Sequence, residues 1–307
     1  MKIYSIEQIS EQRLIKNRGD FMAVVISGKE LASTKRNEMK ELIPSLKEKY
    51  GREPHLAVIL VGEDPGSVSY VTGKEKACIE VGVKNTTIKK DANITEDELL
   101  AIIDDLNNDD LVDGILVQLP LPKHIDTDKV INRINPLKDV DGFHPMNVAG
   151  LYLRQPGIIP CTPKGIIQVI ESAGIQIAGK KACVIGRSNI VGMPVSKLLL
   201  DKNATVTIAH SKTENLASVT SEADILIAAV GKPLFVTADM VKDGAVVIDV
   251  GVNRNEETKK LCGDVDFVNV KEKASYITKV PGGIGPMTIT CLIENTIECY
   301  NNKMKSK

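Results

Sequence analysis

The sequence predicts a two-lobed α/β protein, and three observations support this fold class. Short apolar runs of strand length alternate with longer segments of helical period, which is the pattern of parallel βαβ units. The chain has 307 residues, of which 43% are hydrophobic, so it can bury a core in each of two lobes. Residues 135–163 are rich in Pro and Gly, and we expect a connection between lobes there rather than core secondary structure.

The first lobe is predicted from apolar runs in the first half of the chain. Its expected strands are His55–Val61, Leu111–Leu119 and a weaker one at Val83–Ile88. A helix from about Ser67 to Val81 should end at Gly82, a residue that suits the left-handed C-cap. The next helix should begin at Thr95, because Thr95 and Glu98 have the spacing of a capping box.

The second lobe repeats the alternation, which predicts a doubly wound, Rossmann-like sheet. Its strands are expected at Lys181–Ile185, Thr205–Ala209, Asp224–Val230 and Ala245–Val250. Thr162 and Pro163 should cap and open a helix that ends at Gly174. A final helix, Thr288 to about Tyr300, should follow PGGIGPM, an apolar, glycine-rich shaped loop that can lie close to a ligand.

Charge balance and cysteine spacing exclude several classes of protein. The net charge of -1 lacks the basic field of a nucleic-acid binder, and no apolar run approaches the roughly 20 residues of a membrane helix. The six cysteines lie far apart without a C-x-x-C pair, so neither a disulfide framework nor a metal site is expected. We expect a soluble, cytoplasmic protein with reduced thiols and small-molecule partners.

Residues 1–21 have neither the apolar core of a secretory signal nor the acid-poor composition of a transit peptide. Met22 then opens a new apolar run, AVVISG. Our hypothesis is that the folded protein begins near Met22 and that residues 1–21 are an extension of unknown role, dispensable or misassigned.

A glycine turn after the strand KACVIG indicates a dinucleotide site. Gly186 permits a tight turn, and backbone amides at the start of the following helix could face a pyrophosphate. The spacing G-x-S-x-x-x-G departs from G-x-G-x-x-G, and taken alone it is more simply an ordinary βα turn. The next strand ends in HSK without a carboxylate, so Arg187, Ser211 and Lys212 could hold a 2′-phosphate, which favours NADP over NAD. A solvated turn with incidental charge is the alternative.

Polar side chains in the first lobe form a second candidate site. Ser67, Tyr70 and Lys74 share one face of a predicted helix, where the lysine could carry protons and the ring could stack on a flat heterocycle. An ordinary solvated helix face is the commoner explanation of such spacing. Gln118 ends a strand and Asp141 lies in a DVDG turn, positions where open α/β sheets place ligand contacts. A strand-end cap and a turn aspartate are the simpler alternatives.

From about Met22 to Tyr300 the chain resembles the bifunctional methylenetetrahydrofolate dehydrogenase/methenyltetrahydrofolate cyclohydrolase family. The resemblance rests on six stretches in the right order: SVSYVTGKEKAC, ILVQLPLP, KDVDGFHPMNVAG, PCTPKG, VIGRSNIVGMPV and PGGIGPMT. It implies a folate-binding catalytic domain at 22–145, completed by a returning helix at 288–303. It also implies an NADP-binding Rossmann domain at 160–287, with the folate cleft between the two.

The same resemblance implies a role for individual residues. Lys74 would be the key catalytic residue of the cyclohydrolase step, Gln118 would support it, Tyr70 would stack on the folate and Asp141 would bind the pterin ring. Ser67 and Gly283 would complete the substrate site. The cofactor residues would be Gly186, Arg187, Ser188, Ser211, Val252 and Thr162, the last near the nicotinamide end.

The implied activity is oxidation of methylenetetrahydrofolate by NADP followed by hydrolysis to formyltetrahydrofolate, in one-carbon metabolism, by a homodimer that binds tetrahydrofolate derivatives. The alternatives are a monofunctional dehydrogenase on the same scaffold and a non-catalytic NADP-binding module. A fused formyltetrahydrofolate synthetase is argued against because the chain has no G-x-x-x-x-G-K-[ST] loop.

Overall fold

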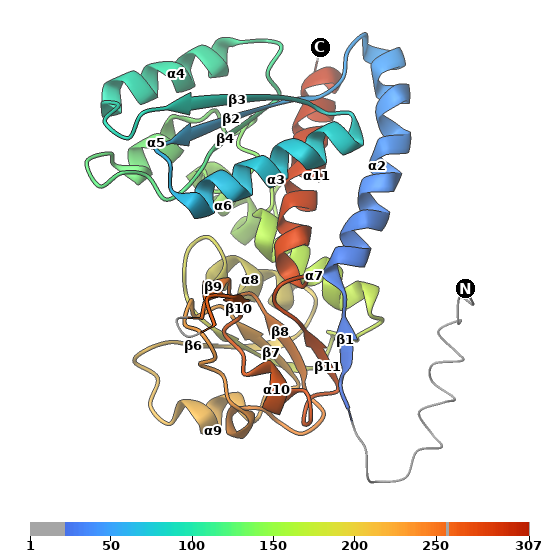
Figure 1. The fold of residues 1–307 in the computed structure, drawn as a ribbon. Helices are drawn as coiled ribbons and strands as arrows, with labels where there is room; N and C mark the ends of the chain where they lie inside the picture. Colours follow the sequence, from blue (N-terminus) through green and yellow to red (C-terminus); the bar gives the residue numbers. More distant parts are fainter. Residues whose placement is uncertain (1–21, 256–257, 307) are drawn as a thin grey trace.

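The computed structural model describes residues 22–255 and 258–306, which form two α/β lobes joined by long helices (Figure 1). The predicted extension, residues 1–21, lies outside the described residues. In the described part of the chain, no helix combines the length and apolarity needed to cross a membrane, and no group of His, Cys, Asp and Glu could hold a metal ion. The six cysteines carry free thiols.

The first lobe is built on a parallel sheet with the strand order β3-β2-β4. The strands are β2 (His55–Val61), β3 (Lys84–Lys90) and β4 (Gly114–Val117), so each predicted strand is present, the third one shortened. Every residue of β2 is buried, since helices cover both faces of the sheet. Leu56, Val58 and Leu60 face the core shared with α3 (Pro65–Val81), and the alternate residues face the core shared with α4 (Glu96–Asn108) and α5 (Thr127–Arg133).

The local helix signals in this lobe are confirmed. Helix α3 ends at Gly82, whose φ of 90° is left-handed and whose N–H bonds to the carbonyl of Cys78. Helix α4 begins with the reciprocal capping box of Thr95 and Glu98.

The second lobe contains a parallel sheet with the order β1-β11-β8-β7-β5-β6, which confirms the doubly wound prediction. Its strands are β1 (Val24–Ile26), β5 (Lys181–Ile185), β6 (Thr205–Ala209), β7 (Ile225–Ala228), β8 (Val246–Asp249) and β11 (Tyr276–Thr278). The connecting helices are α8 (Gly192–Asp201), α9 (Leu216–Thr220), the 3-10 helix η1 (Ala238–Met240) and α10 (Phe267–Val270). A short antiparallel pair, β9 (Asn253–Arg254) and β10 (Leu261–Cys262), lies between β8 and α10.

The start of the described chain differs from the predicted domain boundary. Strand β1 pairs in parallel with β11, so residues 24–26 belong to the sheet of the second lobe, although the sequence placed residue 22 onward in the first. Helix α2 (Gly28–Tyr50), which the sequence analysis did not predict, then carries the chain to the first lobe. The pairing of β1 was not readable because its partner is more than two hundred residues away in sequence.

Three predictions around the lobe connection were wrong in detail. Helix α6 (Pro145–Leu153) lies inside the stretch expected to lack secondary structure, with His144 capping its first turn. Helix α7 (Cys161–Ser172) is capped by Pro160, so Thr162 is not the N-cap but a residue of the first turn. Helix α11 (Ile284–Lys305) begins inside the loop predicted before it, because a proline such as Pro286 is tolerated in a first turn, where its missing N–H has no helical partner.

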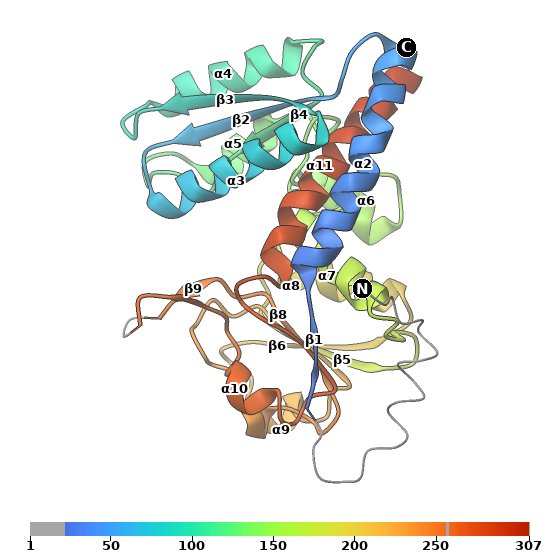
Figure 2. The ribbon, with the colours of Figure 1, turned by 45° about the vertical axis from the view of Figure 1, so that its right-hand side comes forward.

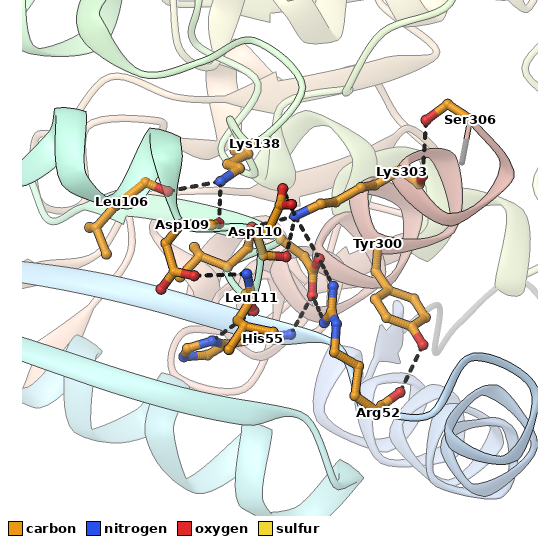
Figure 3. A network of polar contacts seen from close by, with 12 residues as sticks. Arg52, His55, Leu106, Asp109, Asp110, Leu111, Lys138, Tyr300, Lys303 and Ser306 are labelled. Atoms are coloured by element: carbon orange, nitrogen blue, oxygen red, sulfur yellow. Dashed lines mark hydrogen bonds and ion pairs between the residues drawn. The ribbon is translucent and has the colours of Figure 1, made fainter.

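Helices α2 and α11 lie side by side in both views and span the two lobes (Figures 1 and 2). The carboxyl end of α11 is fixed to the first lobe, where Tyr300 and Lys303 point toward Arg52 and Asp110 (Figure 3). The Tyr300 hydroxyl donates to the carbonyl of Arg52 at 2.7 Å, and Lys303 Nζ donates to the carbonyl of Asp110. Arg52 in turn makes a bidentate pair, at 2.6 Å and 2.6 Å, with buried Asp113. The last helix therefore begins at one lobe and ends anchored in the other.

Candidate active site

A cavity of about 410 Å³ lies between the lobes, and residues of both lobes line it. Its walls include the predicted site residues Ser67, Tyr70, Lys74, Gln118, Asp141, Thr162 and Val252. Helix α3 supplies the first three from one face, the end of β4 supplies Gln118, and the loop after β8 supplies Val252. Tertiary structure thus brings together residues that lie in five separate stretches of the sequence.

Lys74 and Gln118 form the polar centre of this cavity. The Lys74 side chain is 8% exposed, and its Nζ donates to Gln118 Oε1 at 2.9 Å. Gln118 Nε2 donates to the carbonyl of Leu119 at 2.6 Å, which fixes the amide so that its oxygen faces the lysine. The spacing of Tyr70 and Lys74 also allowed an ordinary solvated helix face. In the structure this face lines the inter-lobe cavity instead, and Lys74 is buried.

Asp141 faces the same cavity from a tightly held loop. Burial raises the pKa of its carboxyl group to about 6, against the lowering effect of the nearby Lys74 cation. The loop is shaped by buried Asp139, whose carboxylate accepts from the N–H groups of Gly142 at 3.0 Å and His144 at 2.8 Å and from the Asn147 amide at 2.9 Å. Asp141 can therefore change its charge near neutral pH while its backbone stays fixed.

The cavity wall also carries polar groups available to a ligand. Ser67 Oγ is buried and has no hydrogen-bond partner among the described residues, which is unusual for a buried hydroxyl. Thr162 Oγ1, which also lines the cavity, lies 3.0 Å from Thr288 Oγ1, so this contact joins α7 to α11. Phe143 lines the cavity as well and was missed as a site residue, although it follows the DVDG turn directly.

A second cavity, of about 460 Å³, opens at the carboxyl ends of β5 and β6. Gly186, Arg187, Ser188 and Ser211, four of the expected cofactor residues, line it, whereas Lys212 is not among its lining residues. Lys232, which follows β7, supplies a cation that sequence reasoning missed. The described residues that line this cavity include no Asp or Glu.

The glycine turn is built by close packing. Gly186 has a φ of 128°, and a side chain there would collide with the carbonyl of Ala229. We expected the backbone amides at the start of α8 to face a ligand, and for two of them this was wrong. The N–H groups of Val191 and Gly192 donate instead to Ser188 Oγ, at 3.2 Å and 3.4 Å. The cations and hydroxyls of the wall, rather than these amides, are the groups that fit the phosphates of a dinucleotide.

The two cavities are neighbours, because one loop serves both. Gly186 and Ser188 line the second cavity, and Ile190 of the same loop lines the cavity between the lobes. Val252 lies in the inter-lobe cavity, not beside the glycine turn. Gly283 lines neither cavity and caps α11 next to Ile284, so its assignment to the substrate site stays a prediction.

The doubly wound sheet, the glycine turn and the adjoining inter-lobe cavity define a two-lobed α/β enzyme of the dinucleotide-binding class. Residues 26–141 match the model for the tetrahydrofolate dehydrogenase/cyclohydrolase catalytic domain, and residues 160–304 match that for the NAD(P)-binding domain of the same family. The chain belongs to the tetrahydrofolate dehydrogenase/cyclohydrolase family.

Individual relatives agree with the family models. The chain is 59% identical over 277 residues to the bifunctional protein FolD of Bacillus anthracis, a match that covers 90% of this chain and 96% of the relative. The crystal structure of the bifunctional FolD of Campylobacter jejuni superimposes with a TM-score of 0.89 at 49% identity, covering 91% of this chain and 99% of the other. The FolD structure from Trypanosoma brucei, complexed with NADP and an inhibitor, also gives a TM-score of 0.89, at 37% identity, covering 92% of this chain and 99% of that chain.

Proposed function

We propose that the protein oxidises methylenetetrahydrofolate to methenyltetrahydrofolate with NADP⁺ and hydrolyses the product to formyltetrahydrofolate. The observation that carries this proposal is the bonded Lys74–Gln118 pair, which lies with Asp141 in the inter-lobe cavity, directly beside the dinucleotide cavity. Both catalytic tasks, hydride transfer and hydrolysis, then take place on one bound substrate. The C. jejuni relative is described as a methylenetetrahydrofolate dehydrogenase/cyclohydrolase, which supports the same pair of reactions here.

In the first reaction, NADP⁺ supplies the hydride acceptor. Arg187, Ser188, Ser211 and Lys232 would hold its phosphates, and the absence of a carboxylate among the described lining residues favours the 2′-phosphate. Thr162, in the adjoining inter-lobe cavity, would approach the nicotinamide end. The task of the protein is to align the methylene carbon with the acceptor and to exclude water at that moment.

In the folate cavity, the ring of Tyr70 stacks on the pterin and the carboxylate of Asp141 accepts hydrogen bonds from its ring nitrogens. Ser67 Oγ, without a partner of its own, is a further donor for the substrate. These contacts orient the reacting carbon toward the neighbouring dinucleotide cavity. Tyr70 and Asp141 thus serve both reactions.

In the second reaction, water attacks the methenyl carbon and the imidazoline ring opens. Lys74 accepts and returns the protons, and Gln118 holds its Nζ in place. We also propose that the protein acts in the cytoplasm as a homodimer, as the family resemblance implies.

The test is a spectrophotometric assay of the purified protein with methylenetetrahydrofolate and either NADP⁺ or NAD⁺, with the reduced cofactor and the methenyl compound followed as separate signals. We expect NADPH with little accumulated methenyl compound, and hydrolysis of methenyl compound added directly. Reduction with stoichiometric methenyl accumulation would leave only a dehydrogenase. No reduction with either cofactor would defeat the proposal.

A further inference from the structure

Asp264 is a fully buried carboxylate, 0% exposed, to which the proposed reactions give no task. It lies between β10 and α10 and is surrounded by hydrogen-bond donors. Its Oδ2 accepts from the backbone N–H groups of Val230 at 2.6 Å and Gly231 at 2.9 Å. Its Oδ1 accepts from the N–H of Lys232 at 3.0 Å and from Asn253 Nδ2 at 2.8 Å. One carboxylate therefore holds three successive backbone amides and a side-chain amide.

These donors belong to the walls of both cavities. Val230 and Lys232 line the dinucleotide cavity, and Val252, next to Asn253, lines the inter-lobe cavity. The loop after β7 and the loop after β8 are thus tied to the same carboxylate. A shift of Asp264 would move both walls together.

The backbone of Asp264 is itself fixed by a second buried carboxylate. Asp249, the last residue of β8, accepts from the N–H groups of Asp264 at 2.9 Å and of Val265 at 3.0 Å, and from Gly251 at 3.0 Å. Asp264 is therefore attached to the end of a central strand, which makes it a rigid support for the two loops.

We propose that Asp264 is a positioning residue for hydride transfer, which holds the loops after β7 and β8 so that the dinucleotide and the folate meet in a reactive arrangement. It contacts neither ligand and acts through the segment Val230–Lys232 and through Asn253. The inference rests on the proposed function. The expected effect on the rate of hydride transfer is large, because a misplacement of the reacting groups by about 1 Å can cost roughly 100-fold in rate.

The test is Asp264→Asn in the full chain. An amide replaces one acceptor oxygen by an NH₂ group, so donors face donors whichever way it is turned. We expect the KM for NADP⁺ to rise about tenfold or more, or the dehydrogenase kcat to fall by a similar factor. Hydrolysis of added methenyl compound should fall by a clearly smaller factor than the dehydrogenase reaction, because Lys74 and Gln118 are untouched.

Asp266→Asn is the matched control, because it removes the same charge two residues away and Asp266 lines neither cavity. Asp266 is the N-cap of α10, and asparagine serves as an N-cap about as well as aspartate does. NADPH binding can be followed by the change in fluorescence of the reduced cofactor itself. The control should bind NADPH as the wild type does. Asn253→Ala, which removes a single donor, should change the dehydrogenase in the same direction by a smaller factor.

A rescue separates positioning from general damage. In Asp264→Asn with Asn253→Asp, the new amide can donate to the new carboxylate while its oxygen accepts from Val230 and Gly231, so part of the dehydrogenase activity should return. Unchanged dehydrogenase kinetics in both single variants, or an equal loss of both activities together with the melting temperature, would overturn the inference. A wild type that fails to reduce NADP⁺ would instead defeat the proposed function.

Discussion

Lys74 Nζ lies 2.9 Å from Gln118 Oε1, although the two residues are 44 positions apart in the chain. The contact joins helix α3 to the end of strand β4 across the cavity floor. It matters because a flexible lysine becomes a group of defined position only when a fixed acceptor holds it. Gln118 is such an acceptor, since its own amide is bound to the carbonyl of Leu119.

Lys74→Met should abolish hydrolysis of methenyltetrahydrofolate, with a loss of at least about 100-fold, because the group that moves the protons is removed while its volume is kept. The measurement is the decay of added methenyl compound without NADP⁺. Lys76→Met, on an exposed turn of the same helix, is the matched control and should behave as the wild type. An unchanged rate in the Lys74 variant would remove this residue from the mechanism.

Gln118→Glu should also depress hydrolysis, by about tenfold or more, because a carboxylate at 2.9 Å stabilises the ammonium form of Lys74. The measurement is the decay of added methenyl compound, compared with that of the wild type. Gln155→Glu, at an exposed position, controls for the added charge. An unchanged rate would show that hydrolysis does not need the Gln118 amide.

The pH dependence of substrate binding should report on Asp141. Its carboxyl group, whose pKa burial raises to about 6, is ionised above that pH and protonated below it. If the ionised form accepts from the pterin, kcat/KM for methylenetetrahydrofolate should fall as the pH drops from 8 through about 6 toward 5, approaching tenfold per unit. The pKa of Asp249 is also raised to about 6 by burial, so the experiment uses saturating NADP⁺. A flat profile between pH 5 and 8 would contradict this role.

Asn295→Leu should destabilise the protein by about 2–4 kcal/mol. Asn295 is 0% exposed; its Nδ2 donates at 2.9 Å to the carbonyls of both Val140 and Ile159, and its Oδ1 accepts from Lys164 at 2.8 Å. Leucine leaves these buried groups without that partner, which should lower the melting temperature by several degrees. Asn302→Leu, exposed near the end of the same helix, should leave it nearly unchanged.

Gly28→Ala should weaken folate binding and stability together. A Cβ at Gly28 would collide with the carbonyl of Gly283, so the start of α2 and the start of α11 cannot both keep their places. Overpacking of this kind costs about 1–3 kcal/mol, and the shift should reach Ile284 and Gly285, which line the inter-lobe cavity. The readouts are the melting temperature and the KM for methylenetetrahydrofolate. Lys29→Ala, with an exposed side chain next in sequence, is the control.

The features that the sequence predicted well are those whose signals are local. The capping box of Thr95 and Glu98, the left-handed turn at Gly82 and the strand His55–Val61 each depend on residues within a few positions of one another. Helix α6 escaped prediction because proline and glycine also mark loops, although Pro145 occupies the first turn, where it is tolerated.

The candidate site was predicted in part, for the same reason. Gly186 and Ser188 stand in one turn and could be read together, and the resemblance supplied Lys74 and Gln118 as a pair. Lys232 carries no motif, and only the position of β7 beside β5 brings it to the dinucleotide cavity. The role of Asp264 could not be predicted from the sequence either, because its hydrogen bonds join loops that are far apart in the chain.

The sequence by itself determined the alternation of strands and helices and the glycine turn, because these depend on hydrophobic periodicity and local backbone preference. It also showed that most of the polar site residues stand in stretches that resemble those of a known family. Only the tertiary structure decided that β1 completes the second sheet, that Lys232 lies at the dinucleotide cavity, and that Asp264 holds the backbone after β7. These outcomes depend on which apolar faces and hydrogen-bonding edges find each other when the whole chain is buried together, and no local segment contains that information.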